Sequence, residues 1–113
     1  MNTLTVKIGF DRELPPTLLD GFIAPLAAEL QGAWRISQTL VRKVRRAEAP
    51  DPFKPSSDLF VTITFDGETT ASRMDYFTSQ LRSELTKDGD KKEAWGMGTS
   101  RVIAVANMNG AEG

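Results

Sequence analysis

Residues 4–13 have the sequence LTVKIGFDRE, and residues 59–68 have the sequence LFVTITFDGE. The two stretches share the pattern L-x-V-x-I-x-F-D-x-E and begin 55 residues apart. Apolar residues at every second position are typical of a β-strand with one buried face. In both copies, turn-forming residues and then a segment with helical spacing follow. The repeat therefore predicts two halves, each made of a strand followed by a helix.

The first half is expected to begin with a strand over residues 1–10 and a helix that starts at Pro15 and Pro16. Apolar residues then recur at helical spacing up to Gly32. Pro25 lies inside this helix, and an interior proline loses a backbone hydrogen bond and clashes with the preceding turn. We therefore expect a kink there, or a break into two short helices.

Residues 34–46 fit a strand and a helix almost equally well. The apolar residues alternate as in a strand, but Gln38 interrupts the alternation. We favour a strand because the first half would then be β-α-β, like a second half that closes with a strand over residues 100–108. The helix stays open as the alternative.

The second half is expected to follow a proline-rich loop over residues 47–57 and to begin with a strand over residues 58–65. The next helix should be capped by Thr69, Thr70 or Ser72 and should end near Gly89. Its apolar stripe is formed by Met74, Phe77, Leu81 and Leu85. The last strand, residues 101–107, is apolar on both faces, so we expect it to be central or covered on both sides.

This order of elements predicts an α+β fold. The most economical arrangement is a ferredoxin-like β-α-β-β-α-β sandwich, in which a four-stranded antiparallel sheet has two helices on one face. We expect a single globular domain over residues 1–108 and a flexible tail over residues 109–113.

Composition excludes several kinds of catalytic site. The chain contains no histidine and no cysteine, which rules out imidazole acid–base catalysis, Ser-His-Asp triads, thiolate nucleophiles and disulfides. The 14 Lys and Arg residues nearly balance the 15 Asp and Glu residues, so the whole molecule shows no preference for a polyanionic partner. The sequence predicts no cofactor and no membrane span, and we expect a cytoplasmic protein.

Four carboxylates follow the repeated strands: Asp11, Glu13, Asp66 and Glu68. Paired carboxylates can bind Mg²⁺ or act as acid and base. In the expected antiparallel sheet the two pairs would lie at opposite edges and could not converge. We therefore expect them to favour the N-termini of helices, and a metal-dependent enzyme is the least favoured function.

The densest basic segment is formed by Arg42, Lys43, Arg45 and Arg46, with Arg35 and Lys54 nearby in the sequence. Such a cluster can contact nucleic-acid phosphates or an acidic protein surface, although a solvated basic face is the commoner case. Trp95 and Met97 belong to a glycine-rich loop that precedes a strand, which does not suit a phosphate-binding loop. Aromatic residues and methionine are enriched at protein interfaces.

The outward positions of the two repeated strands are Thr5, Lys7 and Gly9 in the first and Phe60, Thr62 and Thr64 in the second. One phenylalanine does not make a platform on which RNA bases stack. This small, threonine-rich face would suit packing against another sheet, in a homodimer or on a partner protein, and exposure to water is the alternative.

The favoured hypothesis is a non-enzymatic protein-binding module that occludes or bridges a macromolecular partner. Its predicted contacts are Arg42, Lys43, Arg45 and Arg46 for electrostatic docking, with Phe53, Trp95 and Met97 as apolar anchors. Small inhibitors of bacterial machinery encoded by phages or mobile elements are similar to this chain in size and compactness only. A nucleic-acid-binding protein that uses residues 42–46 is the alternative.

Overall fold

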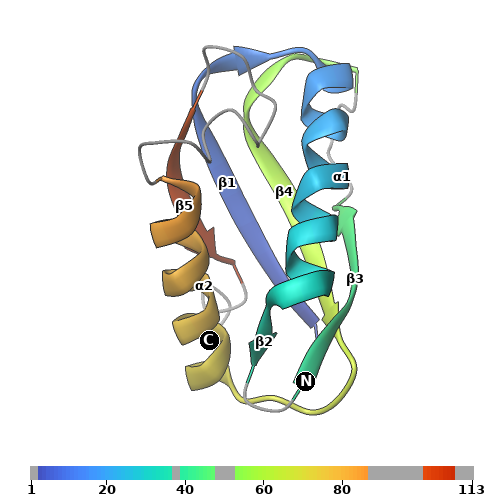
Figure 1. The fold of residues 1–113 in the computed structure, drawn as a ribbon. Coiled ribbons are helices and arrows are strands. Elements are labelled where there is room, and N and C mark those ends of the chain that lie inside the picture. The colour runs from blue at the N-terminus through green and yellow to red at the C-terminus, as the bar shows by residue number, and fades with distance from the viewer. Residues whose placement is uncertain (1–2, 37–38, 48–52, 87–100, 109–113) are drawn as a thin grey trace.

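The computed structural model describes residues 3–36, 39–47, 53–86 and 101–108. The elements, in chain order, are β1 (Thr3–Leu14), α1 (Pro16–Ala33), β2 (Arg35–Ile36), β3 (Thr39–Arg46), β4 (Ser56–Phe65), α2 (Ala71–Leu85) and β5 (Val102–Asn107). The strands form an antiparallel sheet in the order β2-β3-β4-β1-β5, and both helices lie in front of it in Figure 1. The predicted α+β architecture, an antiparallel sheet with two helices, is confirmed. The expected tail, residues 109–113, lies outside the described residues.

The two copies of the repeat form the neighbouring strands β1 and β4. Every apolar residue of the shared pattern is buried, and they are Leu4, Val6, Ile8, Phe10, Leu59, Val61, Ile63 and Phe65. These side chains belong to one hydrophobic cluster together with apolar residues of both helices. The prediction that the alternation marks a strand with one buried face is confirmed for both copies.

β1 extends beyond the expected boundary and changes register on the way. It ends at Leu14, and its pairing with β4 and with β5 shifts after Gly9. Gly9 and Phe10 are both buried, so the strict alternation stops at this point. Such an irregularity bends a strand and increases its twist, and the Figure 1 ribbon curves toward α1 here.

Residues 34–46 are extended, as we favoured, but they do not form a single strand. β2 pairs antiparallel with the start of β3, so that Arg35 lies opposite Leu40 and Ile36 lies opposite Thr39. The expectation of one strand is therefore wrong. The interruption of the alternation at Gln38 coincides with the reversal between β2 and β3, although residues 37–38 themselves lie outside the described residues.

Helix α1 runs without interruption through Pro25. The expected break into two short helices is therefore wrong. Pro15 and Pro16 occupy the start of the helix, where a missing amide donor costs nothing. Its buried side chains Leu19, Phe22, Leu26 and Leu30 face the sheet. None of the described helices is long and apolar enough to span a membrane.

Helix α2 begins as its sequence predicts. The Oγ1 atom of Thr70 accepts a hydrogen bond from the Arg73 amide at 3.3 Å, which makes Thr70 the N-cap among the three expected candidates. The predicted stripe of Met74, Phe77, Leu81 and Leu85 is buried. The helix ends at Leu85, and Gly89, the expected stop, lies outside the described residues.

The two helices are anchored on the sheet by aromatic contacts. Phe22 of α1 meets Phe10 edge to face, with ring centroids 5.4 Å apart. Phe77 of α2 makes similar contacts with Phe65 at 5.3 Å and with Trp34 at 5.4 Å. Edge-to-face pairs of this kind add to the free energy gained from burying the rings. They fix both helices over the same face.

β5 does not meet the expectation for a strand that is apolar on both faces. It is the last strand in the sheet order, and within the described residues it pairs with β1 alone. Val102 and Val105 are buried, whereas Ile103 is 60% exposed and Ala104 is also exposed. The strand is therefore neither central nor covered on both faces by described residues. Alanine is small enough to occupy an exposed sheet position with little apolar area left in water.

Candidate docking site on the sheet

The basic segment lies on β3, and a β-bulge sets the direction of its side chains. Val41 pairs with Phe65 and Lys43 pairs with Thr64, so that Arg42 is an extra residue in the strand. Val41 and Val44 are buried on the core side, whereas Arg42, Lys43 and Arg45 are exposed. In a regular strand only one of two consecutive side chains would lie on the outer face. The bulge leaves both Arg42 and Lys43 exposed to solvent.

Arg46 differs from the other three cations of the segment. It lies opposite the buried Val61, on the helix side of the sheet, and its Nη1 atom is 2.7 Å from the Oδ1 atom of Asp20 on α1. The Arg46 side chain is 18% exposed and that of Asp20 is 60% exposed. Arg46 therefore links β3 to α1, and its charge is already paired.

The outer edge of β3 is partly covered. β2 pairs with Thr39 and Leu40, and the Nε2 atom of Gln31 on α1 donates a hydrogen bond to the Arg42 carbonyl at 2.6 Å. Charged residues on an edge strand also keep it from pairing with other chains. A binding role for Arg42, Lys43 and Arg45 therefore has to be separated experimentally from this protective role.

The face of the sheet away from the helices, called here the helix-free face, is built from directly opposed residues. Residues opposite each other in an antiparallel pair point to the same side. One row across the strands is Lys43, Thr64 and Thr3; the next is Arg45, Thr62 and Thr5; the third is Phe60, Lys7 and Ala106; the fourth is Asp58, Gly9 and Ala104. The outward positions expected from the sequence are therefore correct for β1 and β4.

The charges on the helix-free face are mainly positive. Lys7, Lys43 and Arg45 make no ion pair or side-chain hydrogen bond within the described part of the chain. Asp58 is the one acidic residue in the four rows, and it lies in the row beyond Lys7. Lys7 and Phe60 lie directly opposite each other on the two central strands, and both are half-buried.

The four carboxylates that follow the repeated strands do not form a common site. β1 and β4 run antiparallel, so Asp11 and Glu13 lie at one end of the pair and Asp66 and Glu68 at the other. Among the described residues no three acidic side chains gather as ligands for a metal ion. Neither helix has an acidic residue in its first turn, so the expectation that these carboxylates favour helix N-termini is wrong.

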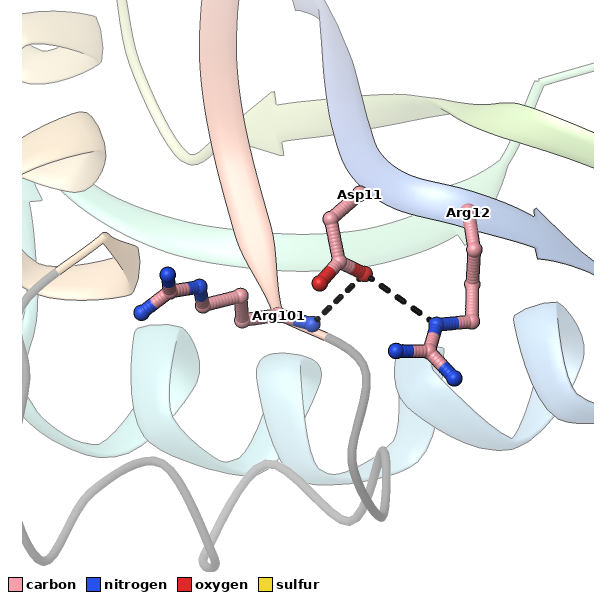
Figure 2. Close-up of polar contacts among 3 residues, drawn as sticks. All are labelled: Asp11, Arg12 and Arg101. Carbon is pink, nitrogen blue, oxygen red and sulfur yellow. Dashed lines mark hydrogen bonds and ion pairs between the residues drawn. The ribbon is translucent and has the colours of Figure 1, made fainter.

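Asp11 instead joins β1 to the start of β5, as Figure 2 shows. Its Oδ1 atom accepts a hydrogen bond from the Arg101 amide at 3.2 Å and lies 3.6 Å from the Nε atom of Arg12. The Asp11 amide in turn donates to the Arg101 carbonyl at 3.1 Å. A carboxylate that satisfies a backbone donor at a strand junction has a structural role.

The expected apolar anchors are only partly described. Phe53 precedes β4 and is 87% exposed. Trp95 and Met97 lie outside the described residues. Lys54, next to Phe53, is exposed as well. Within the described chain, the predicted anchors thus reduce to one phenylalanine.

The sequence pattern predicted the basic segment as a candidate site. It did not predict that Lys7 and Phe60 belong to the same site. Their common face follows from the alternation, whereas their direct opposition depends on strand order and register. In the sequence, only the spacing within the repeat bears on this opposition. If the two repeated strands are taken as antiparallel neighbours, their positions can be aligned with each other.

No protein-family model matches this chain, and no curated protein matches its sequence. The class of protein is therefore described from the fold and surface of the chain itself. It is an α+β domain whose sheet has helices on one face and threonines with cations on the other. Three cations of β3, Arg42, Lys43 and Arg45, are exposed.

Proposed function

We propose that the chain is a non-enzymatic protein-binding module that occludes or bridges a partner through the exposed cations of β3. The observation that supports this proposal is the bulge that exposes Arg42 and Lys43 side by side, with Arg45 on the same strand. An inhibitor of bacterial machinery encoded by a phage or a mobile element would act in this way. We also propose that the sheet is a variant of the ferredoxin-like type in which β2 is an addition, because β1 and β4 are central and antiparallel.

The cations suit recognition of a partner better than stabilisation of the domain. An exposed ion pair contributes only about 0.2–1 kcal/mol, so each cation adds little by itself. Several cations on one strand, however, raise the rate of association with an acidic surface and disfavour basic partners. Phe53 adds an exposed aromatic side chain, the residue type that contributes strongly at the centre of interfaces.

A nucleic-acid-binding function is the second candidate, and the opposition of Lys7 and Phe60 on the central strands favours it. Single-stranded nucleic acids bind to sheets on which aromatic rings stack with bases and cations contact phosphates. One half-buried ring provides little stacking area. The sequence isoelectric point of about 5.4 is also far below that of typical nucleic-acid-binding domains.

The proposal can be tested by affinity capture with two charge-reversed variants of the full chain. In the site variant, Lys43→Glu is combined with Arg45→Glu, and in the control Arg73→Glu is combined with Arg82→Glu. Arg73 and Arg82 are exposed in the first and last turns of α2, so their effects on the helix dipole oppose each other. Both variants change the net charge equally.

We expect wild type and control to capture the same protein from lysate of the native host and the site variant to lose it. Circular dichroism and light scattering must show that both variants are folded and unaggregated, because the cations also protect the edge of β3. Equal capture by the site variant and the control would refute the proposed function. Loss of a captured nucleic acid instead of a protein would support the second candidate.

A further inference from the structure

We propose that the docking site extends from β3 across the helix-free face to Lys7 and Phe60, and that an acidic segment of a partner protein occupies it. This inference rests on the proposed function and names the surface and the chemistry of the partner. The three cations Lys7, Lys43 and Arg45 lie on this face without ion-pair partners in the described residues.

The register fixes the spacing of these cations. Lys43 and Arg45 are two residues apart on one strand, which corresponds to about 7 Å. Lys7 lies two strands away, with β4 between, and one row further along, which corresponds to about 12 Å from Arg45. An extended acidic segment presents carboxylates on one side at about the same interval as Lys43 and Arg45. Such a segment could contact all three cations by crossing the sheet diagonally.

The side chains between the cations suit a polypeptide. Thr62 and Thr64 lie on β4 between the β3 cations and β1, and their hydroxyl groups can donate hydrogen bonds to carboxylates. Phe60 lies directly opposite Lys7 and offers apolar contact next to that charge. Charge, hydroxyl donors and one aromatic ring are thus arranged on the same face.

A second copy of the chain is a poor occupant of this face. In a two-fold homodimer the same patch meets itself, so the cations of one copy would face those of the other. Asp58 is the one acidic residue in the four rows and cannot neutralise three cations. Repulsion between like charges therefore disfavours the face-to-face homodimer that the threonine-rich pattern suggested.

Nucleic acid is also disfavoured. Its affinity grows with the number of phosphates that the protein neutralises, and this face supplies three cations and one aromatic ring. The chain as a whole has a formal net charge of −1, which adds no long-range attraction for a polyanion. A short acidic protein segment needs fewer charge contacts and profits from the hydroxyl groups.

The test maps binding on the isotopically labelled full chain by NMR. The probes are a decaglutamate peptide and, separately, a ten-nucleotide thymidine strand, each titrated at low salt. We expect decaglutamate to shift the amide signals of Lys7, Phe60 and Thr62 together with those of Lys43 and Arg45. Lys7→Glu and Lys7→Gln should each weaken peptide binding by about threefold or more, the effect of removing one exposed ion pair, whereas Arg73→Glu should not.

Each contrary outcome has a distinct meaning. Shifts confined to β3, with no effect of either Lys7 variant, would overturn the extension across the sheet and leave the proposed function standing. No shift on β3 or on the helix-free face would contradict both. Tighter binding of the thymidine strand to the same residues would identify nucleic acid as the occupant. Shifts that depend on protein concentration without any probe would identify a second copy.

Discussion

Val6 of β1 lies directly opposite Val61 of β4, and the two valines are corresponding residues of the sequence repeat. Both are fully buried at 0% exposure. Because the strands are antiparallel, the repeat pairs with itself in reverse, so that Leu4 lies opposite Ile63 and Ile8 opposite Leu59. A local two-fold axis therefore passes between the two valines and relates the central strands of the sheet.

This symmetry predicts similar energetic costs for matched substitutions. Val6→Ala and Val61→Ala each remove about two buried carbon groups and leave a cavity, so each should lower the free energy of unfolding by about 2–3 kcal/mol. Urea denaturation of both variants measures these costs. Values that differ by more than about 1.5 kcal/mol would show that the two halves of the core are packed differently.

A charge placed in the central strands should abolish folding. Ile8 and Ile63 are fully buried, and Ile8→Asp or Ile63→Asp would bury a carboxylate without a partner. We expect circular dichroism to show no cooperative thermal transition for either variant. Thr62→Asp, on the helix-free face, is the control and should stay folded. A folded Ile8→Asp protein would refute the assigned core.

Helix α1 contains two residues whose replacement should stabilise the domain. A Cβ atom added at Gly21 meets nothing within 4 Å, so Gly21→Ala should raise the free energy of unfolding by about 0.5–1 kcal/mol. Pro25→Ala should restore a helical hydrogen bond and stabilise further, by about 1–3 kcal/mol. Thermal melts of the single variants measure both effects. A lower melting temperature for Pro25→Ala would mean that the ring packs better than alanine.

The pair Asp20–Arg46 should affect stability but not partner binding. Asp20→Asn should cost less than about 1 kcal/mol, and high salt should shrink the difference, because the carboxylate is largely exposed. Arg46→Ala should cost more than Asp20→Asn, since the half-buried arginine also loses packing of its aliphatic stem. Urea denaturation at low and high salt tests this ranking. If folded Arg46→Ala captured less of the partner than wild type, Arg46 would have to be counted among the residues of the docking site.

The N-cap of α2 offers a simple local test. Thr70→Ala removes the acceptor for the Arg73 amide and should lower the free energy of unfolding by about 1 kcal/mol. Thr70→Ser and Thr70→Asp keep an acceptor at this position and should retain most of the stability. If all three variants melt at the same temperature, the cap contributes nothing to stability.

The repeat carried most of the information about the fold that could be obtained from the sequence. Alternation identified the buried residues of β1 and β4, and helical spacing identified the stripe of α2. The antiparallel pairing of β2 with β3 was missed because a two-residue strand such as β2 has too few positions to show a period. The apolar composition of β5 suggested burial on both faces, yet Ile103 and Ala104 are exposed.

The basic segment of the candidate site could be predicted from the sequence. The set of residues that share one face of the sheet with it could not. Arg45 and Arg46 are neighbours in the sequence, but one lies on the helix-free face and the other reaches Asp20 on α1. The bulge at Arg42 sets which residues point outward, and no local pattern reveals it. Lys7 is more than thirty residues away in the sequence and joins the site only through the order of the strands.

The most direct test of the central claim is the salt dependence of binding to the captured partner, measured by calorimetry for wild type and for Lys43→Glu combined with Arg45→Glu. For wild type we expect the affinity to fall between about 50 mM and about 300 mM salt, and at low salt the variant should bind at least about tenfold more weakly. The slope against salt should also flatten in the variant. Equal affinities and equal slopes for the two proteins would contradict the claim that the β3 cations bind the partner.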